Sequence, residues 1–182
     1  MRIIGGAFKS RIFRPGKNFK ARPTTDFARE NLFNILDNRY NFDNKKILDL
    51  FSGTGSITFE FASRGCQNIT CIELDRFHYN FICSVIETLD IKDTVKAING
   101  DVFKFIGRSI EHYDIIFADP PYELKRLPEL PELILNGHLL VEDGLLILEH
   151  GKTNDFSSHP CFSELRTYGS VHFSFFIKKM QQ

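Results

Sequence analysis

The sequence predicts an α/β fold built on a doubly wound, mostly parallel sheet that ends in an antiparallel hairpin. Between residues 46 and 149, short apolar runs rich in β-branched residues alternate with longer stretches of helical periodicity. After His150 the chain becomes polar and turn-rich, and two strand-like runs follow. The chain has 182 residues, of which 42% are hydrophobic, and this is enough for one core. We therefore expect a single domain over residues 1–182.

The N-terminal part is expected to hold a small basic hairpin and one helix. Residues 2–4 and 11–13 can pair as short strands on either side of Gly5 and Gly6. Residues 26–40 place apolar side chains near helical spacing, and either Thr24 or Thr25 can cap that helix.

Seven strands and four further helices follow from the pattern. Parallel strands are expected at residues 46–51, 68–73, 94–98, 113–118 and 144–149, and helices at 56–63, 76–89, 102–109 and 129–136. Pro128 and Pro131 suit the first turn of the last helix. Strands at 165–168 and 171–177, divided by Gly169 and Ser170, predict the closing hairpin.

The charge is balanced over the chain but concentrated at its start. There are 23 basic and 23 acidic residues. Seven cations precede the first acid, Asp26, and they are Arg2, Lys9, Arg11, Arg14, Lys17, Lys20 and Arg22. We interpret residues 1–25 as a basic extension that contacts phosphates, through Arg2, Lys9, Arg11, Arg14 and Arg22. The alternative is a solvated tail.

Several classes of protein are excluded by what the sequence lacks. No window approaches the ~20 apolar residues of a membrane-spanning helix, and nothing after Met1 resembles a secretion signal. The four cysteines lack the CxxC spacing of a zinc site, so we expect reduced thiols and no metal. A cytoplasmic protein without membrane contact is expected.

A glycine-containing loop follows the first strand of the sheet. Gly53 and Gly55 allow a tight turn and a close approach of the backbone to a ligand, directly before a helix N-terminus. Glu73 ends the second strand about twenty residues later, where a carboxylate can accept both hydroxyls of a ribose. A cofactor that contains a nucleoside is predicted.

The residues around this loop favour S-adenosylmethionine over a dinucleotide. Thr58 occupies the place of the third glycine of a dinucleotide fingerprint. Asp49, four residues before Gly53, would repel a pyrophosphate and attract a cationic amino acid moiety. Asp101, after the third strand, can accept a hydrogen bond from the adenine amino group. The alternative is a loop of turn-forming residues with ordinary acids at strand ends.

The fourth strand leads into Asp119, Pro120, Pro121 and Tyr122 at the carboxyl edge of the sheet. Asp119 and the carbonyl of Pro120 can accept the two N–H groups of a planar amine, which favours a lone pair directed at a methyl donor. Tyr122 can stack on a base, and a base in a duplex would be flipped out to reach it. The alternative is a rigid turn, because two prolines fix φ and stop the strand.

These motifs resemble those of a known family. The glycine loop and the sequence Asp-Pro-Pro-Tyr are similar to those of Rossmann-like class I methyltransferases that act on exocyclic amines. The sequences MRIIGG at residues 1–6, RPTTD at 22–26 and LFNIL at 32–36, with Arg29 and Glu30, resemble the RsmD family of bacterial 16S ribosomal RNA guanine-N2 methyltransferases.

The resemblance implies a role for each matching position. It implies that Asp49, Phe51, Gly53 and Gly55 line the methionine end of the cofactor, Glu73 the ribose, and Asp101 with Val102 the adenine. It further implies that Arg22 to Thr25, including Thr24, border the cofactor and that Asp119 to Tyr122 form the amine site. Ser52 stands where many relatives have Ala.

The resemblance makes ribosomal RNA of the small subunit the expected partner, and we expect a monomer. A DNA adenine-N6 methyltransferase is one alternative, but the chain has no room for the separate recognition region those enzymes usually carry. A protein glutamine methyltransferase is another, although such enzymes favour Asn at the position of Asp119. The third alternative is an RNA-binding module without activity.

Overall fold

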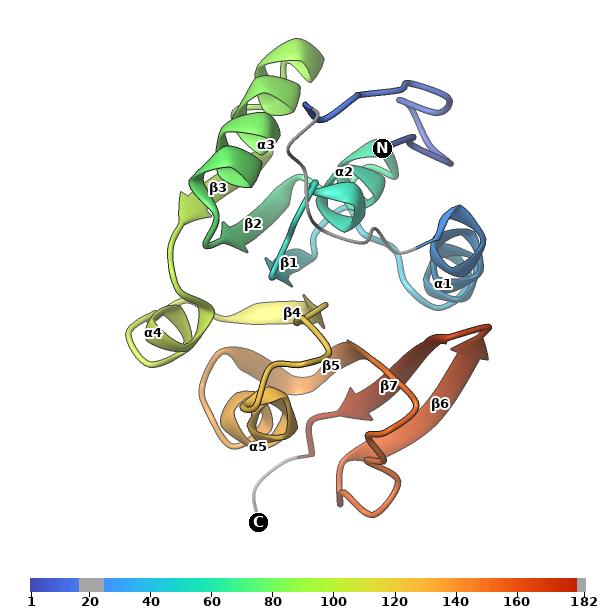
Figure 1. The fold of residues 1–182 in the computed structure, drawn as a ribbon, viewed down its shortest axis with the longest axis vertical. Helices are drawn as coiled ribbons and strands as arrows, with labels where there is room; N and C mark the ends of the chain where they lie inside the picture. The colour runs from blue at the N-terminus through green and yellow to red at the C-terminus, as the bar shows by residue number, and fades with distance from the viewer. Residues whose placement is uncertain (17–24, 180–182) are drawn as a thin grey trace.

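The computed structural model describes residues 1–16 and 25–179 and contains a central seven-stranded sheet (Figure 1). The strands lie in the order β3-β2-β1-β4-β5-β7-β6. Their bounds are Lys46–Leu50 for β1, Asn68–Glu73 for β2, Val95–Asn99 for β3, Tyr113–Ala118 for β4, Leu140–His150 for β5, Phe162–Tyr168 for β6 and Val171–Ile177 for β7. The first five strands are parallel, and β7 pairs antiparallel with β5 and β6. The predicted doubly wound sheet with a C-terminal antiparallel hairpin is confirmed.

Helices cover both faces of the sheet (Figure 1). One face carries α1 (Asp26–Arg39), α2 (Ser56–Ser63) and α3 (Arg76–Leu89), and the other carries α4 (Val102–Ile106) and α5 (Leu130–Leu135), the latter after a 3₁₀ turn at Leu127–Glu129. Successive strand side chains point to opposite faces, so Ile47 packs with the first group and Leu48 with the second. Burial on both faces explains the continuous apolar runs in the sequence.

Three element boundaries differ by three or more residues from those expected. One is the start of β6, at Phe162 rather than at residue 165, because the strand pairs with β7 from Phe162 onward. Strand β5 begins at Leu140 rather than at residue 144, because the turn-forming Asp143 (φ 58°) lies inside the strand as an irregularity. The main chain of Lys178 holds it there, since Lys178 accepts from Asp143 N–H at 3.0 Å and donates to the carbonyl of Gly144 at 3.0 Å. Helix α4 ends at Ile106 rather than at residue 109 and is followed by the cap residue Gly107.

The N-terminal segment forms the expected hairpin-like turn. Arg2 and Ile12 form an antiparallel bridge, and Ile3 N–H donates to the carbonyl of Arg11 at 3.0 Å. Thr25 caps α1 by accepting from Ala28 N–H at 3.2 Å, as predicted. Two expected site residues, Arg22 and Thr24, lie outside the described residues. Within the described part of the chain, no helix is long and apolar enough to cross a membrane.

Candidate active site

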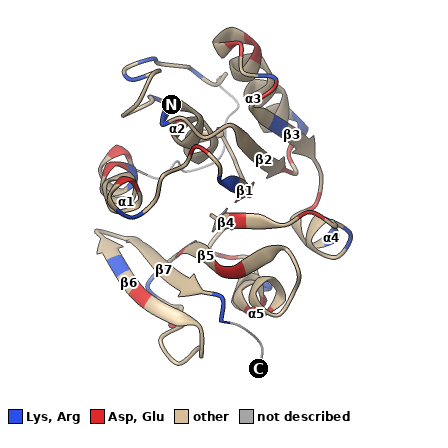
Figure 2. Ribbon diagram, turned by 180° about the vertical axis from the view of Figure 1, so that it is seen from behind, with Lys and Arg blue, Asp and Glu red and all other residues tan. Residues whose placement is uncertain are grey.

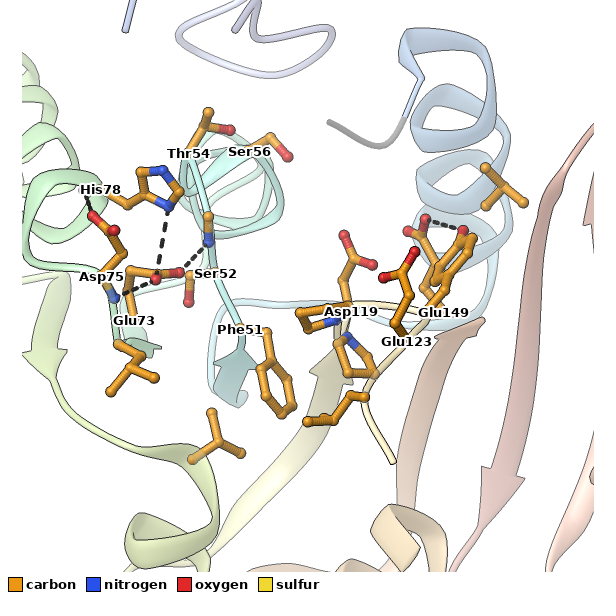
Figure 3. A pocket seen from close by; sticks show the side chains of 18 of the residues that line it. Phe51, Ser52, Thr54, Ser56, Glu73, Asp75, His78, Asp119, Glu123 and Glu149 are labelled. Carbon is orange, nitrogen blue, oxygen red and sulfur yellow. Dashed lines mark hydrogen bonds and ion pairs between the residues drawn. The ribbon is translucent and has the colours of Figure 1, made fainter. Parts of the chain in front are cut away.

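A cavity of about 670 Å³ opens at the carboxyl ends of the parallel strands. Loops after β1, β2, β3 and β4 contribute to its walls, together with Thr25, Glu149 near the end of β5, and Ser170 and Val171 at the start of β7. This edge is where doubly wound sheets bind their ligands, and the volume is typical of ligand pockets. Figure 3 shows Glu73, Asp75 and His78 on one flank and Asp119, Glu123 and Glu149 on the opposite flank, with Phe51 between them.

The loop after β1 takes its shape from left-handed backbone conformations. Phe51, Gly53 and Gly55 have φ angles of 60°, 53° and 73°. A Cβ atom on Gly55 would lie 2.7 Å from Cε2 of Phe59, so only glycine fits at the start of α2. A Cβ atom on Gly53 would meet no atom within 4 Å, and the N–H of Gly53 donates to Glu73 Oε2 at 2.7 Å. The two glycines therefore serve different purposes, one packing against the helix and the other shaping the pocket.

Glu73 is fixed at the end of β2 by backbone donors. In addition to the bond from Gly53, Oε1 of Glu73 accepts from Asp75 N–H at 2.7 Å. His78 Nδ1 lies 3.8 Å from the same oxygen. An ionised carboxylate can accept about four hydrogen bonds, so two backbone bonds orient it and leave capacity for the hydroxyls of a ribose.

The next wall of the pocket combines an acid with a flat apolar surface. Asp101 caps α4, its Oδ1 accepting from Lys104 N–H at 2.8 Å. Val102 and Phe103 also line the pocket, and the ring of Phe103 meets that of Phe51 edge to face at a centroid distance of 6.3 Å. This arrangement suits a planar heterocycle with an amino group at its edge.

The loop after β4 is joined to the loop after β1. Asp119 N–H donates to the carbonyl of Leu50 at 3.2 Å, so the two loops leave neighbouring strands side by side. The Pro121 carbonyl accepts from Leu124 N–H at 2.9 Å, which closes a tight turn. Tyr122 is 38% exposed, and its hydroxyl donates to Glu149 Oε1 at 3.0 Å. One flank thus offers carboxylates beside an accessible aromatic ring.

Most of the predicted site residues are brought together in this cavity. Those that line it are Thr25, Phe51, Gly53, Glu73, Asp101, Val102, Asp119, Pro120, Pro121 and Tyr122. Asp49 and Gly55 do not line it. The carboxylate of Asp49 is buried and accepts from Thr58 N–H at 3.2 Å and from Thr58 Oγ1 at 2.5 Å, behind the loop. Direct contact of Asp49 with a cofactor therefore stays a prediction.

The buried carboxyl of Asp49 should make stability depend on pH. Burial raises its pKa from 3.8 to about 7, although hydrogen bonds from Thr58 oppose the rise. Between these two values the unfolded chain has released a proton that the folded protein still holds. The free energy of unfolding should therefore fall as pH rises, by about 1.4 kcal/mol per pH unit, and level off above pH 7.

The variant Asp49→Asn should remove this dependence, because the amide can still accept from Thr58 and carries no charge. We expect urea unfolding to give similar stabilities for both proteins near pH 4 and a more stable variant at pH 8, by up to about 4 kcal/mol. Parallel stability curves for the two proteins would contradict the assignment.

The sequence analysis missed several residues of the cavity. Ser170 and Val171 reach it from the turn between β6 and β7, and His78 from the first turn of α3. Glu149 is the most informative omission, because it is 3% exposed and still lines the cavity. Its position at the end of a strand was a usable signal, since the carboxyl ends of all parallel strands meet at one edge.

Solved structures show which class of protein has this architecture. An RNA methyltransferase from Salinibacter ruber, in complex with S-adenosyl-L-homocysteine, has a TM-score of 0.70 at 14% identity and covers 88% of this chain and 96% of its own. A hypothetical protein of Thermus thermophilus has a TM-score of 0.84 at 25% identity, with coverage of 97% and 98%. The fold is the Rossmann-like fold of class I methyltransferases.

The family follows from sequence comparison. A family model described as Conserved hypothetical protein 95 matches residues 1–177. The ribosomal RNA small subunit methyltransferase D of Buchnera aphidicola subsp. Baizongia pistaciae is 34% identical over 155 residues, which are 84% of this chain and 77% of the relative. The chain belongs to this family, the RsmD family, and the expected resemblance is confirmed.

Proposed function

We propose that the protein transfers a methyl group from S-adenosylmethionine to the exocyclic N2 amine of a guanine in small-subunit ribosomal RNA. The observation that carries the proposal is the bond from Asp119 N–H to the carbonyl of Leu50, at 3.2 Å. It places the proline turn beside the glycine loop, so that one cavity can hold a methyl donor and a planar amine face to face. The printed name of the Buchnera relative supports ribosomal RNA as the substrate.

The donor set of the cavity fits S-adenosylmethionine. The oriented carboxylate of Glu73 suits a ribose, and Asp101 with Val102 and Phe103 suits an adenine. The bound cofactor supplies an electrophilic methyl group on a positively charged sulfur. The structure from Salinibacter ruber, which holds the demethylated product of this cofactor, supports the same choice.

The remaining residues prepare the amine. Its lone pair is delocalised into the purine ring, so it is a weak nucleophile. Asp119 and the carbonyl of Pro120 would each accept one N–H, which favours a pyramidal nitrogen whose lone pair faces the methyl carbon. Once the nitrogen has taken the methyl group it carries a positive charge, and it would pass the proton of the N–H that Asp119 accepts to the carboxylate of Asp119. Tyr122 would stack on the base, worth ~1–3 kcal/mol.

The basic N-terminal segment is proposed to hold the RNA. Arg2, Lys9, Arg11 and Arg14 are exposed, and no acid lies among residues 1–16 (Figure 2). Arg2 forms an ion pair with Asp26 at 3.0 Å, whereas no ion pair is found for the other three in the described structure. Each cation that neutralises a phosphate should steepen the salt dependence of binding.

Reversal of three of these charges tests the segment. Lys9→Glu, Arg11→Glu and Arg14→Glu together should lower methylation of ribosomal particles by at least about 100-fold at 0.15 M salt. Calorimetry with S-adenosylhomocysteine should give an unchanged Kd, because these side chains do not line the cavity. Unchanged RNA activity would remove the segment from the proposed interface.

The reaction itself is tested with labelled cofactor and small ribosomal subunits from a strain that lacks this gene. We expect the label in N2-methylguanosine at one position. Label in N6-methyladenosine, in DNA or in protein glutamine would favour an alternative substrate. No transfer to any of these, despite cofactor binding, would overturn the assigned reaction.

A further inference from the structure

Asp119 and Glu149 are two acids that lie at the carboxyl ends of neighbouring strands, at the same level of the sheet. Strands β4 and β5 are parallel, and Ala118 pairs with Leu148. Asp119 follows Ala118 and Glu149 follows Leu148, so the backbones of the two acids lie about 4.8 Å apart at the carboxyl edge of the sheet. Both side chains line the cavity, and Figure 3 shows them on the flank opposite Glu73. The fold therefore presents a pair of carboxylates, one of which the proposed reaction does not use.

Glu149 is buried and held in place. It is 3% exposed, and Oε1 accepts from the hydroxyl of Tyr122 at 3.0 Å. The Tyr122 ring is fixed from another side by Gly151, where a Cβ would lie 3.1 Å from Cδ2 of the ring. A carboxylate can accept about four hydrogen bonds, so the bond from Tyr122 orients Glu149 and leaves it able to accept from a ligand.

We propose that Glu149 selects guanine by accepting its N1–H while Asp119 accepts an N–H of the neighbouring N2 amine. This inference rests on the proposed function. Guanine presents N1–H and N2–H side by side, and two adjacent acceptors match that pair. Adenine and 2-aminopurine carry a lone pair at N1, which would face the carboxylate of Glu149 and be repelled. A buried acceptor left without its donor also costs free energy.

The competing role for Glu149 is purely structural. If it only anchored Tyr122, its loss would weaken stacking for every base to a similar extent. The two roles can be told apart by the ratio of the methylation rates on two different bases. The rate on a single base would not separate them.

The experiment compares small subunits that carry guanine or 2-aminopurine at the mapped target position. Both bases have the 2-amine, and they differ at N1 and O6. The wild type should methylate guanine at least about 100-fold faster. Glu149→Gln should reduce that ratio at least about 10-fold, because the amide oxygen can still accept from Tyr122 while the amide N–H can donate to N1 of 2-aminopurine. Tyr122→Phe keeps the stacking ring and leaves Glu149 as an acceptor for N1–H, so it should lower the ratio by less than Glu149→Gln does.

Glu142→Gln makes the same chemical change at the exposed, opposite end of β5 and should alter neither rate nor ratio. An unchanged ratio in Glu149→Gln, or an equal collapse in Tyr122→Phe, would overturn the selection role while the proposed function stands. Equal wild-type rates on the two bases would do the same without any variant. A wild type that transfers nothing to guanine would overturn the proposed function, and this inference with it.

Discussion

Asp119→Ala is expected to lower kcat by about 1,000-fold while the Kd for S-adenosylmethionine changes less than about twofold. The side chain lies on the amine flank of the cavity, opposite Glu73, so its removal leaves the cofactor wall intact (Figure 3). What is lost is the acceptor that directs the lone pair of the amine at the methyl carbon. Such an interaction is made in the transition state, so its loss lowers kcat and kcat/KM together.

Single-turnover rates with saturating cofactor, together with calorimetry on S-adenosylhomocysteine, would measure the two quantities separately. Asp114→Ala is a matched control, because Asp114 lies at the start of β4, the strand that Asp119 follows, and pairs with Lys45 away from the cavity. It should keep its turnover. Turnover retained in Asp119→Ala would mean that the amine binds elsewhere, whereas a weakened Kd would mean that Asp119 supports the cofactor.

The order of the elements could be predicted because it depends on local patterns. Strands buried on both faces read as continuous apolar runs, and helices between them read as periodic ones. The start of β5 was wrong because it depends on a distant contact. Asp143 and Gly144 look like a turn in the sequence, yet the main chain of Lys178 pairs on both sides of them and keeps β5 continuous.

The site was predictable where a residue's role follows from its place at a strand end, as for Glu73 and Asp119. The site was less predictable where the direction of a side chain decides whether the residue lines the pocket. Asp49 shares a face of β1 with Ile47, because side chains alternate along a strand. This face packs against α1, α2 and α3, so the Asp49 carboxylate meets Thr58 on α2 and does not line the pocket. Glu149 depends on β5 lying next to β4, which only the order of strands in the sheet reveals.

A second feature invisible to the sequence analysis is a buried ionic cluster beneath the N-terminal segment. Glu60 on α2 is fully buried and forms ion pairs with Arg29 and Arg64. Its Oε1 accepts from Ile4 N–H at 2.5 Å, and its Oε2 from Gly5 N–H at 3.4 Å. The carboxylate thus ties the basic segment to α2. Charged residues on a helix are ordinarily solvated, so the sequence pattern did not single out this position.

Glu60→Ala is therefore expected to lower the free energy of unfolding by about 3–5 kcal/mol, because it removes a carboxylate that balances the charge of the buried Arg29. Arg29 is 1% exposed, and burial already lowers the pKa of its guanidinium. It keeps its bonds to Asp26 Oδ1 and to the carbonyl of Arg2, both at 2.7 Å, but these satisfy only one end of the group. Urea unfolding would measure the loss, and hydrogen exchange should show faster exchange of the Ile4 and Gly5 amides.

Two controls separate this charge effect from a general cost of mutation. Glu60→Gln retains an acceptor for the backbone and should lose less stability than Glu60→Ala. Glu87→Ala removes an exposed glutamate from α3, where it pairs with Lys92 at 3.4 Å, and should change stability by less than about 1 kcal/mol. If Glu60→Ala were no more harmful than Glu87→Ala, the cluster would not anchor the segment. The position of the basic residues relative to the cavity would then need another cause.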